Sequence, residues 1–338
     1  MSDIDSLERK IKELERRFTQ KSKLKRDLFV EDVLKSDDSV KFYTGLSTIG
    51  TFNLLCDVLE SGGKKLNYWD TNKGKTLNYQ TTDKKKTGPK RTLSLPEELI
   101  LCLVRVRLGI TGRHLSDIFH VSETLVSHTF TTWICFLSSV FKKTLLLWPS
   151  RADIKKHLPR SFNKYPNTRI IIDCTEVYIE KPTSPYAQKA TWSDYKEHNT
   201  IKALVGITPS GYFSFVSQFW SGCTGDRKIT QESGLLELLE EGDSVMADRG
   251  FNVRDLLTKK KVYLNMPPFS KKGKQLSRAA TKSTRQIAQV RIHVERAIER
   301  LKDFKIFQGN MPLTLTPLAD HVLVVCAALC NLQKPLVR

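Results

Sequence analysis

Two apolar runs in this chain each end on an aspartate, and a basic helix downstream carries a glutamate. The runs are Arg169-Ile-Ile-Ile-Asp173 and Ser244-Val-Met-Ala-Asp248, and the glutamate is Glu295. A carboxylate at the end of a buried strand is costly unless something compensates its charge. Three such groups brought together would repel one another, and a divalent cation is the usual remedy. The pattern predicts carboxylate-bound Mg²⁺-type ions with positions left open to phosphate, the apparatus for cutting and joining nucleic acid.

Each of these acids also has an ordinary structural interpretation. Asp173 could accept hydrogen bonds from backbone amides at a strand end, and Asp248 could form a turn pair with Arg249. Glu295 lies four residues after Arg291, which is the spacing of a salt bridge on a surface helix. Each acid alone is a modest signal. In this order, with basic segments on both sides, the three together favour the metal-site interpretation.

The positive charge of the chain is unevenly distributed. The net charge is +19 over 338 residues. Residues 161–250, which include both strand aspartates, carry nine basic and twelve acidic side chains, a net −3. Residues 61–91 carry a net +7 and residues 251–310 a net +11. An acidic centre between basic segments is the distribution expected of a metal site in a cationic groove for a polyanion.

The seven cysteines are scattered, and most lie inside apolar runs. There is no Cys-x-x-Cys pair and no His pair at zinc-finger spacing, so we do not expect a structural zinc module. Reduced core thiols of an intracellular protein are the simplest interpretation. The charged start predicts no secretory signal. The apolar stretch 317–331 is shorter than a membrane span and contains Asp320 and His321, so we expect a buried helix and no membrane partner.

An apolar seam lies near the start of the chain. Leu7, Ile11, Leu14 and Phe18 are spaced four, three and four residues apart among many charged residues. This spacing predicts a coiled coil of about two heptads. Such a segment could join two chains as a homo-oligomer or remain a solvated amphipathic helix, and a further helix is expected over residues 48–60.

Residues 61–91 have the composition of a flexible basic linker. The cluster at 84–91 contains five lysines and arginines. It fits a nuclear import signal, an arm that contacts phosphate groups, or a solvated loop, and composition does not separate the three.

Residues 92–140 have the pattern of three short helices. Leu95-Pro96-Glu97 begins the first, with proline at an early helical position and acids in the first turn. A second helix over residues 111–119 is followed by a short turn, and Ser122 then caps a third helix from Glu123 toward Leu137. This pattern matches a helix-turn-helix, although it also fits any small three-helix bundle. The side chains expected to face DNA are Arg113, Thr124, Ser127 and His128.

From residue 168 onward, strand patterns alternate with helical ones. Residues 170–179 and 198–208 have the pattern of long strands, and Pro209-Ser-Gly211 predicts a tight turn into a third strand. The later elements are expected to be a helix at 228–240, a strand ending at 248, a helix at 252–260, a strand at 262–264 and a helix at 284–304. This order is that of an α/β fold with an RNase H-like mixed sheet flanked by helices, although other α/β arrangements also fit.

Four segments resemble the successive motifs of the PIF/Harbinger-type DDE transposases. They are Asp173-Cys-Thr-Glu-Val-Tyr-Ile-Glu-Lys-Pro182, Gly222-Cys-Thr-Gly-Asp226-Arg, Met246-Ala-Asp248-Arg-Gly-Phe251 and Arg291-Ile-His-Val-Glu295-Arg-Ala-Ile-Glu-Arg-Leu-Lys302. Residues 92–140 resemble the helix-turn-helix that accompanies this DDE superfamily endonuclease domain. The resemblance extends from the region of residue 40 to the C-terminus.

The resemblance implies that Asp173, Asp248 and Glu295 form the catalytic and metal-binding DDE triad, with two Mg²⁺ ions as cofactor and Mn²⁺ as a substitute. One ion would activate a water or a DNA 3′-hydroxyl, and the other would stabilise the leaving oxygen. Asp226 matches a recurrent acid of secondary role in the family. The first motif reads Asp-Cys-Thr-Glu where many relatives have Asp-Gly-Thr, which adds Glu176 as a second possible secondary acid.

The expected substrate is DNA, both transposon ends and target. Basic side chains around the third acid would hold the DNA backbone through salt-sensitive contacts. These are Lys271, Lys272, Lys274, Arg278, Arg285 and Arg291. Related elements carry a zinc-containing DNA-binding module that this chain lacks, so an accessory DNA-binding protein is an expected partner.

We therefore expect four regions in a nuclear protein. They are a helical, coiled-coil region at 1–60, a basic linker at 61–91, a helix-turn-helix at 92–150 and an RNase H-like DDE nuclease domain at 165–335. Two rival hypotheses remain. The chain could be a domesticated, non-catalytic DNA-binding regulator derived from a transposase, or an RNase H-like hydrolase acting on RNA, against which the helix-turn-helix argues.

Overall fold

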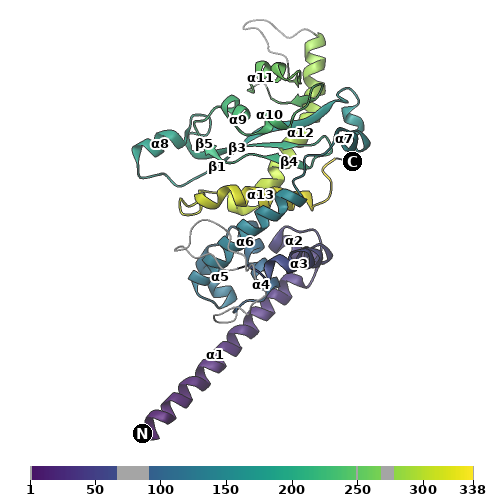
Figure 1. Ribbon diagram of the computed structural model, residues 1–338. Coiled ribbons are helices and arrows are strands. Elements are labelled where there is room, and N and C mark those ends of the chain that lie inside the picture. Colours follow the sequence, from purple (N-terminus) through teal and green to yellow (C-terminus); the bar gives the residue numbers. More distant parts are fainter. Residues whose placement is uncertain (1, 67–90, 249, 268–277, 338) are drawn as a thin grey trace. The chain divides into compact units, whose positions relative to one another are not determined.

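The computed structural model describes residues 2–66, 91–248, 250–267 and 278–337 (Figure 1). The chain divides into two compact units, residues 1–136 and 137–338. Most of the expected basic linker, residues 67–90, lies outside the described residues, and so does most of the basic cluster at 84–91.

The first unit is helical. Its helices are α1 (Ser2–Leu34), α2 (Asp37–Thr44), α3 (Ile49–Gly63), α4 (Leu95–Leu108), α5 (Gly112–Phe119) and the first part of α6 (Glu123–Thr144). Short hydroxyl side chains begin α2 and α3: Ser36 accepts the backbone N–H of Ser39, and Thr48 accepts that of Thr51. Such caps satisfy N–H groups that have no partner in the first turn of a helix. The helix expected over residues 48–60 is confirmed as α3.

Two glutamates in the first turn of α4 hold this unit together. Arg26 of α1 donates to Glu97 at 2.5 Å and to the Phe119 carbonyl at 3.3 Å, which ties α1 to both α4 and α5. The indole N–H of Trp133 in α6 donates to Glu98 at 2.6 Å. Glu98 is fully buried. A buried carboxylate is tolerated only with such partners, so these bonds specify how the helices pack.

The α4–α5–α6 succession has the geometry of a helix-turn-helix. Gly109 (φ 65°) ends α4 and His120 (φ 50°) ends α5, both in the left-handed conformation that terminates a helix sharply. The Ser122 hydroxyl then accepts the N–H of Leu125 at 3.2 Å and begins α6. The three expected helices are therefore confirmed, and α6 continues past its expected end to Thr144.

The second unit is built on a mixed sheet of seven described strands. These are β1 (Thr168–Tyr178), β2 (Trp192–Ser193), β3 (His198–Ile207), β4 (Phe213–Val216), β5 (Trp220–Ser221), β6 (Ser244–Met246) and β7 (Tyr263–Asn265). Strand β1 is central: it pairs antiparallel with β3 and parallel with β6, which in turn pairs parallel with β7. Strands β2, β4 and β5 all pair with β3. Residues 168–172 of β1 are all buried, as their unbroken apolar run predicts.

Helices accompany this sheet (Figure 1). They are α7 (Arg151–Lys156), α8 (Pro185–Thr191), α9 (Asp226–Glu232), α10 (Leu235–Leu238), α11 (Arg254–Lys259), α12 (Arg278–Lys302) and α13 (Ala319–Asn331), with short 3₁₀ turns at Arg160–Phe162, Lys305–Phe307 and Thr316–Leu318. The single helix expected over residues 228–240 is wrong, because Gly234 (φ 86°) separates α9 from α10. The third strand expected from the Pro209 turn is two short strands, β4 and β5. The buried C-terminal helix is confirmed as α13.

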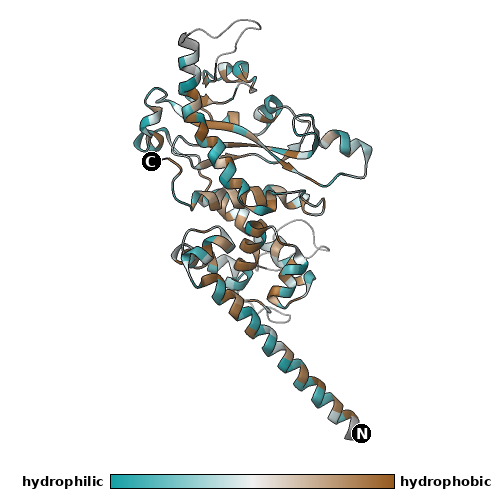
Figure 2. Ribbon diagram, turned by 180° about the vertical axis from the view of Figure 1, so that it is seen from behind, coloured by the Kyte–Doolittle hydropathy of each residue, from teal (hydrophilic) through white to brown (hydrophobic). Residues whose placement is uncertain are grey.

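Among the described helices, α6 is long and apolar enough to cross a membrane by length and composition. However, 61% of its apolar window is buried inside the protein. Figure 2 shows that apolar residues are frequent in both α6 and α13. Burial on most sides is the behaviour of a core helix, and a single helix of this kind is weak evidence for a membrane.

Candidate functional site

Asp173 lies on β1, and Asp248 follows the parallel neighbouring strand β6. In the β1–β6 pair, Ile171 lies opposite Met246. Asp173 and Asp248 each come two residues further along, at the equivalent step of the register. Because side chains alternate between the two faces of a sheet, equivalent positions on parallel neighbours share a face. Asp248 lies two residues beyond the end of β6, and its charge raises the pKa of Asp173, so the two carboxylates lie near one another.

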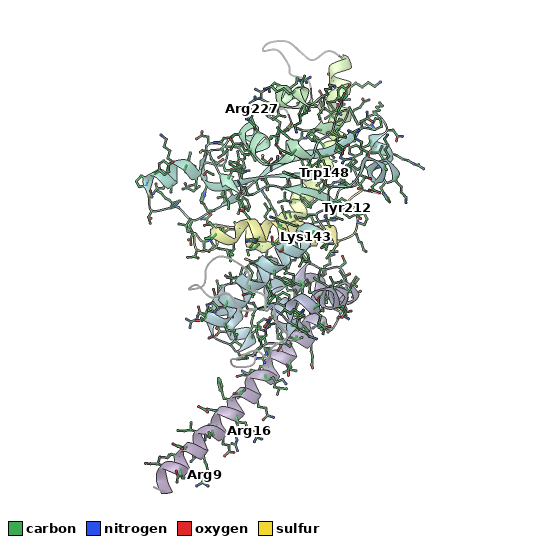
Figure 3. All side chains as sticks on the ribbon, viewed as in Figure 1. Arg9, Arg16, Lys143, Trp148, Tyr212 and Arg227 are labelled. Atoms are coloured by element: carbon green, nitrogen blue, oxygen red, sulfur yellow. The ribbon has the colours of Figure 1, made fainter. Side chains whose placement is uncertain are left out.

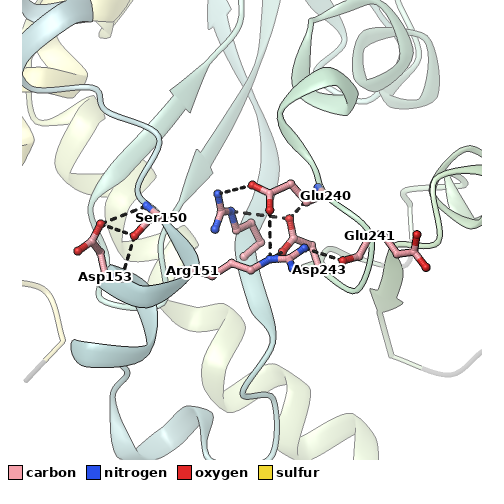
Figure 4. A network of polar contacts seen from close by, with 7 residues as sticks. Ser150, Arg151, Asp153, Glu240, Glu241 and Asp243 are labelled. Atoms are coloured by element: carbon pink, nitrogen blue, oxygen red, sulfur yellow. Dashed lines mark hydrogen bonds and ion pairs between the residues drawn. The ribbon is translucent and has the colours of Figure 1, made fainter.

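A salt-bridge network fixes the start of β6 against the start of β1 (Figure 4). Arg151 donates to Asp243 at 2.8 Å and to the Glu241 carbonyl at 2.6 Å. Arg169, at the beginning of β1, pairs with Asp243 at 3.8 Å and with Glu240 at 3.5 Å. Asp243 and Arg169 are almost fully buried. These contacts tie the segment before β6 to the beginning of β1.

Helix α12 brings the third acid, Glu295, to the same place. Arg291, one turn earlier on α12, lies 3.0 Å from Asp248 and 3.5 Å from Glu295. The Arg291 side chain is only 11% exposed, whereas those of Asp248 and Glu295 are 50% and 56% exposed. A single buried guanidinium therefore bridges two carboxylates that are 47 residues apart in the sequence.

Asp173 is the most buried member of the cluster. Its Oδ1 accepts the backbone N–H of Cys174 at 2.8 Å. Burial raises the pKa of Asp173 to about 6, against the lowering effects of that hydrogen bond and of Arg291. The neighbouring charges of Asp248 and Asp226 also contribute to this rise. Asp173 thus shares one electrostatic environment with both of these acids and with Arg291, which also pairs with Glu295.

The two secondary acids, Glu176 and Asp226, surround a lysine that the sequence motifs did not single out. Lys202 on β3 lies 3.3 Å from Glu176 and 3.4 Å from Asp226. Thr200 also donates to Glu176, at 2.8 Å. Burial lowers the pKa of Lys202, but Asp226 and Glu176 outweigh this effect and raise it overall. Glu176 is therefore engaged in a nearly buried ion pair, in which its side chain is 8% exposed.

Sequence patterns contained a signal for Lys202 that was missed. It is a charged residue in the otherwise mostly apolar strand β3, and a lysine in such a strand requires a carboxylate partner. Lys302, at the end of α12, also faces this region. Burial and Lys196 lower the pKa of Lys302, while Glu176 and Asp173 oppose that effect. Both lysines lie close to the acids and offset part of the repulsion among them.

The unusual cysteine of the first motif has a defined place. Cys174 follows Asp173 on β1, and its thiol hydrogen-bonds to Asp226. Burial, together with the nearby Asp226 carboxylate, raises the pKa of this thiol. The Cys174 side chain therefore links the first motif to the start of α9 as a neutral hydrogen-bond donor.

The donor chemistry of the cluster suits a hard divalent cation, because carboxylate oxygens are the ligands that Mg²⁺ prefers. The raised pKa of Asp173 indicates that its charge is incompletely compensated by the protein alone. Within the described parts of the chain, however, no group of three His, Cys, Asp or Glu side chains is placed to hold an ion. Arg291 bridges Asp248 and Glu295 instead. The chemical type of these side chains suits a metal ion, provided that the Arg291 side chain moves away from Asp248 and Glu295.

The residues expected to contact DNA fall into three groups. In the helix-turn-helix, Arg113, Thr124 and Ser127 are exposed and His128 is half-buried. On α12, Arg285 is exposed, whereas Arg291 points to the carboxylates and not to solvent. The expected contacts at Lys271, Lys272, Lys274 and the Arg278 side chain lie outside the described residues.

The carboxylate cluster lies on a mixed α/β sheet, in a chain that also carries a helix-turn-helix-like succession of helices. Comparison with protein families gives two matches in the same order along the chain. Residues 91–143 match the helix-turn-helix of DDE superfamily endonuclease, and residues 172–331 match the DDE superfamily endonuclease. These matches support a DDE superfamily transposase with a helix-turn-helix. Among curated proteins, none matches this chain.

Proposed function

We propose that this protein is a DDE-type transposase or endonuclease of the PIF/Harbinger type. In this proposal it cuts and joins DNA, and Asp173, Asp248 and Glu295 form its catalytic site. The observation that carries the proposal is the shared guanidinium. Arg291 contacts Asp248 and Glu295 directly and acts on the pKa of Asp173. Three acids from three separate elements are thus gathered around one positive charge. The family matches over residues 91–143 and 172–331 support the same activity.

The proposed roles of the acids follow from their positions. Asp173, Asp248 and Glu295 would provide oxygen ligands for two Mg²⁺ ions, or for Mn²⁺ in their place. In such sites the metal ions supply activation of the attacking hydroxyl and stabilisation of the leaving oxygen. Asp173 must be ionised to serve as a ligand, and a bound cation would favour the charged form that burial disfavours. Lys202 pairs with Glu176 and Asp226, and these two acids would help to orient the three metal-binding acids.

We further propose that the nuclease unit is RNase H-like. The sheet order supports this proposal, because a hairpin-bearing antiparallel half (β3, β4) and a parallel half (β6, β7) flank the central β1. The first acid lies on that central strand and the second follows its parallel neighbour. The third comes from α12, which contacts β1.

DNA would be held by the helix-turn-helix and by cations near the acids. The exposed face at the start of α6, with Thr124 and Ser127, would read base edges, and Arg113 and Arg285 would contact phosphates. Recognition of the transposon ends would be shared with an accessory DNA-binding protein. We propose the nucleus as the working compartment, since the substrate is chromosomal DNA and residues 84–91 form a basic cluster.

A cleavage assay tests the proposal. The full chain would be incubated with labelled duplexes that carry the inverted repeats flanking its coding sequence, in Mg²⁺, in Mn²⁺ and in chelator. We expect strand cleavage that depends on the metal, and a gel shift with the same DNA in chelator. An RNA duplex of the same sequence should remain uncut, and cleavage of RNA alone would contradict the proposal.

A second function, non-catalytic regulation of DNA by a domesticated transposase, is favoured by one observation. Arg291 already pairs with both Asp248 and Glu295 and offsets part of their charge, which helps to stabilise the described cluster without a metal. If this function holds, gel shifts should occur at nanomolar protein, and no product should form in Mg²⁺ or Mn²⁺ at any protein concentration.

A further inference from the structure

The N-terminal half of α1 has no partner within the described part of the chain. Every side chain from Ile4 to Lys21 is exposed, and burial begins only at Ser22. This free segment makes about five turns. Figure 3 shows Arg9 and Arg16 projecting from it into open surroundings. The segment is therefore continuous with the packed half of α1 but unsupported from the side by the described residues.

The free segment carries a continuous apolar face. Ile4, Leu7, Ile11, Leu14 and Phe18 are each between 54% and 73% exposed. Their spacing of three and four residues places them at the a and d positions of a heptad repeat. Figure 2 shows the corresponding apolar turns recurring along α1. Five large side chains aligned on one exposed face are unusual for a helix that stays single.

We propose that this face, residues 4–18, pairs with the same face of a second copy of the chain as a parallel two-stranded coiled coil. In the first two heptads the a positions hold Ile4 and Ile11 and the d positions hold Leu7 and Leu14, and Phe18 takes the third a position. Isoleucine at a with leucine at d is the combination that favours two parallel strands over three or four. This proposal concerns assembly and stands whether or not the protein cuts DNA.

The flanking charges select the parallel orientation. Glu8 and Glu15 occupy e positions, and Lys10 and Arg17 occupy g positions. In a parallel pair, g faces the e position of the next heptad on the other strand, so Lys10 of each copy meets Glu15 of the other. In an antiparallel pair, e faces e and g faces g, which would place glutamate against glutamate. The pattern therefore opposes the antiparallel alternative.

The coil ends where α1 joins its own bundle. Lys21 and Lys25 occupy the next d and a positions and interrupt the apolar line. Arg26 is then buried against Glu97 and the Phe119 carbonyl. Because the bundle holds the second half of α1 helical, the first half extends an existing helix and avoids the cost of nucleation. A coil of only two to three heptads can then be stable.

Sedimentation of the full chain tests the pairing. We expect a dimer with a Kd in the micromolar range, and Leu14→Asp should weaken it by about 100-fold because the variant buries an unpaired charge. Leu14 is exposed in a single chain, so the variant should still fold with unchanged thermal stability when monomeric. Leu54→Asp is the control, since Leu54 is equally exposed but lies on α3. A chain that is monomeric throughout, or a dimer indifferent to Leu14→Asp, would overturn the proposal.

Charge exchange tests the orientation. Lys10→Glu alone and Glu15→Lys alone should each weaken the homodimer, and the double variant should restore it. Mixing the two single variants should yield a heterodimer, because each repelling strand then meets its complement. In a Cys223→Ser background, Leu14→Cys should form a crosslink between copies on mild oxidation, as d positions face each other only in parallel strands. If the double charge variant restored the dimer but Leu14→Cys formed no crosslink between copies, the parallel arrangement would be contradicted.

Discussion

The Arg291 guanidinium lies 3.0 Å from the Asp248 carboxylate and reaches Glu295 from the same side chain. One residue thus pairs with two acids that the sequence motifs assign to a metal site. Arginine cannot be deprotonated in proteins, so only movement of the side chain can release those acids. Metal binding at this cluster should therefore compete with the Arg291 contacts.

Replacing Arg291 with glutamine should strengthen metal binding. We expect the Kd for Mn²⁺ to fall by about tenfold, which corresponds to about 1.4 kcal/mol. Isothermal titration calorimetry on the DNA-free protein would measure it. The metal-free variant should lose no more than about 1 kcal/mol of stability, because Asp248 and Glu295 are half exposed and solvent screens their repulsion.

Arg285→Gln is the matched control for this experiment. Arg285 is an exposed arginine on the same helix and lies six residues before Arg291. The control should leave the Mn²⁺ affinity unchanged. Equal gains from both substitutions would indicate a general charge effect and would refute specific competition by Arg291.

Asp173→Asn and Asp248→Asn should each reduce metal-dependent strand cleavage by at least about 100-fold, a barrier increase of about 3 kcal/mol. Asparagine keeps the shape of the side chain but removes a charged ligand. Circular dichroism should show both variants folded. Asp194→Asn, at an exposed acid between β2 and β3, serves as the control and should cleave normally. Full activity in either triad variant would exclude that residue from the site.

The buried carboxyl of Asp173 predicts a pH-dependent stability in chelator. Its pKa of about 6 in the folded protein exceeds the ordinary value of 3.8. The folded state then binds a proton more tightly than the unfolded state. The resulting stabilisation is complete below pH 4 and disappears as pH rises through 6. Urea unfolding should therefore show up to about 3 kcal/mol less stability from this group at pH 7 than at pH 4.

Asp173→Asn isolates that contribution. The variant should show a flatter profile between pH 4 and pH 6 than the parent chain and should be more stable than it at pH 7 in chelator. Identical profiles would mean that Asp173 titrates normally. With saturating Mn²⁺ the order at pH 7 should reverse, because only the parent gains from the metal.

Lys202→Met should destabilise the second unit by about 3 kcal/mol, because it leaves Glu176 as an unpaired and nearly buried charge. Adding Glu176→Gln should recover most of this loss, since Thr200 can still donate to the amide oxygen. Chemical denaturation of the four variants in a double-mutant cycle would measure the coupling. Lys228→Met, an exposed site on α9, should cost little. Retained cleavage by Glu176→Gln would assign that acid a structural role.

Arg113→Ala should weaken DNA binding without changing its sequence preference. Arg113 is exposed on α5, where a phosphate contact would contribute equally on any duplex. The slope of log K against log salt should fall by about 1. Lys12→Ala on α1 carries the same charge change away from the helix-turn-helix and should leave the slope unaltered. A change of sequence preference in Arg113→Ala would instead indicate contact with base edges.

Local patterns were sufficient to predict α3, α4, α5 and β1. Proline and acids at the start of α4, and the unbroken apolar run of β1, depend on neighbours a few residues away. The break between α9 and α10 was missed, because Gly234 adopts its left-handed conformation inside a stretch that otherwise has a helical composition. Glycine tolerates both conformations, so its presence alone does not reveal which one it takes.

The acidic residues of the candidate site could be predicted from the sequence, but its basic residues could not. Asp173 and Asp248 stand out because a carboxylate after an apolar strand is conspicuous in a sequence. Arg291 resembles its basic neighbours on α12, and only tertiary packing determines which arginine of a helix turns inward. The role of Lys202 depends on its ion pairs with Glu176 and Asp226, which lie on other elements.

All seven cysteines are free, and Cys223 is the exposed one among them. It lies three residues before Asp226, at the margin of the acidic cluster. A nitroxide reagent under limiting conditions would attach there first, without any engineered mutation. Such a label would sit near enough to bound Mn²⁺ for paramagnetic broadening of its spectrum. The natural Cys223 thiol therefore offers a labelling site from which metal occupancy can be followed.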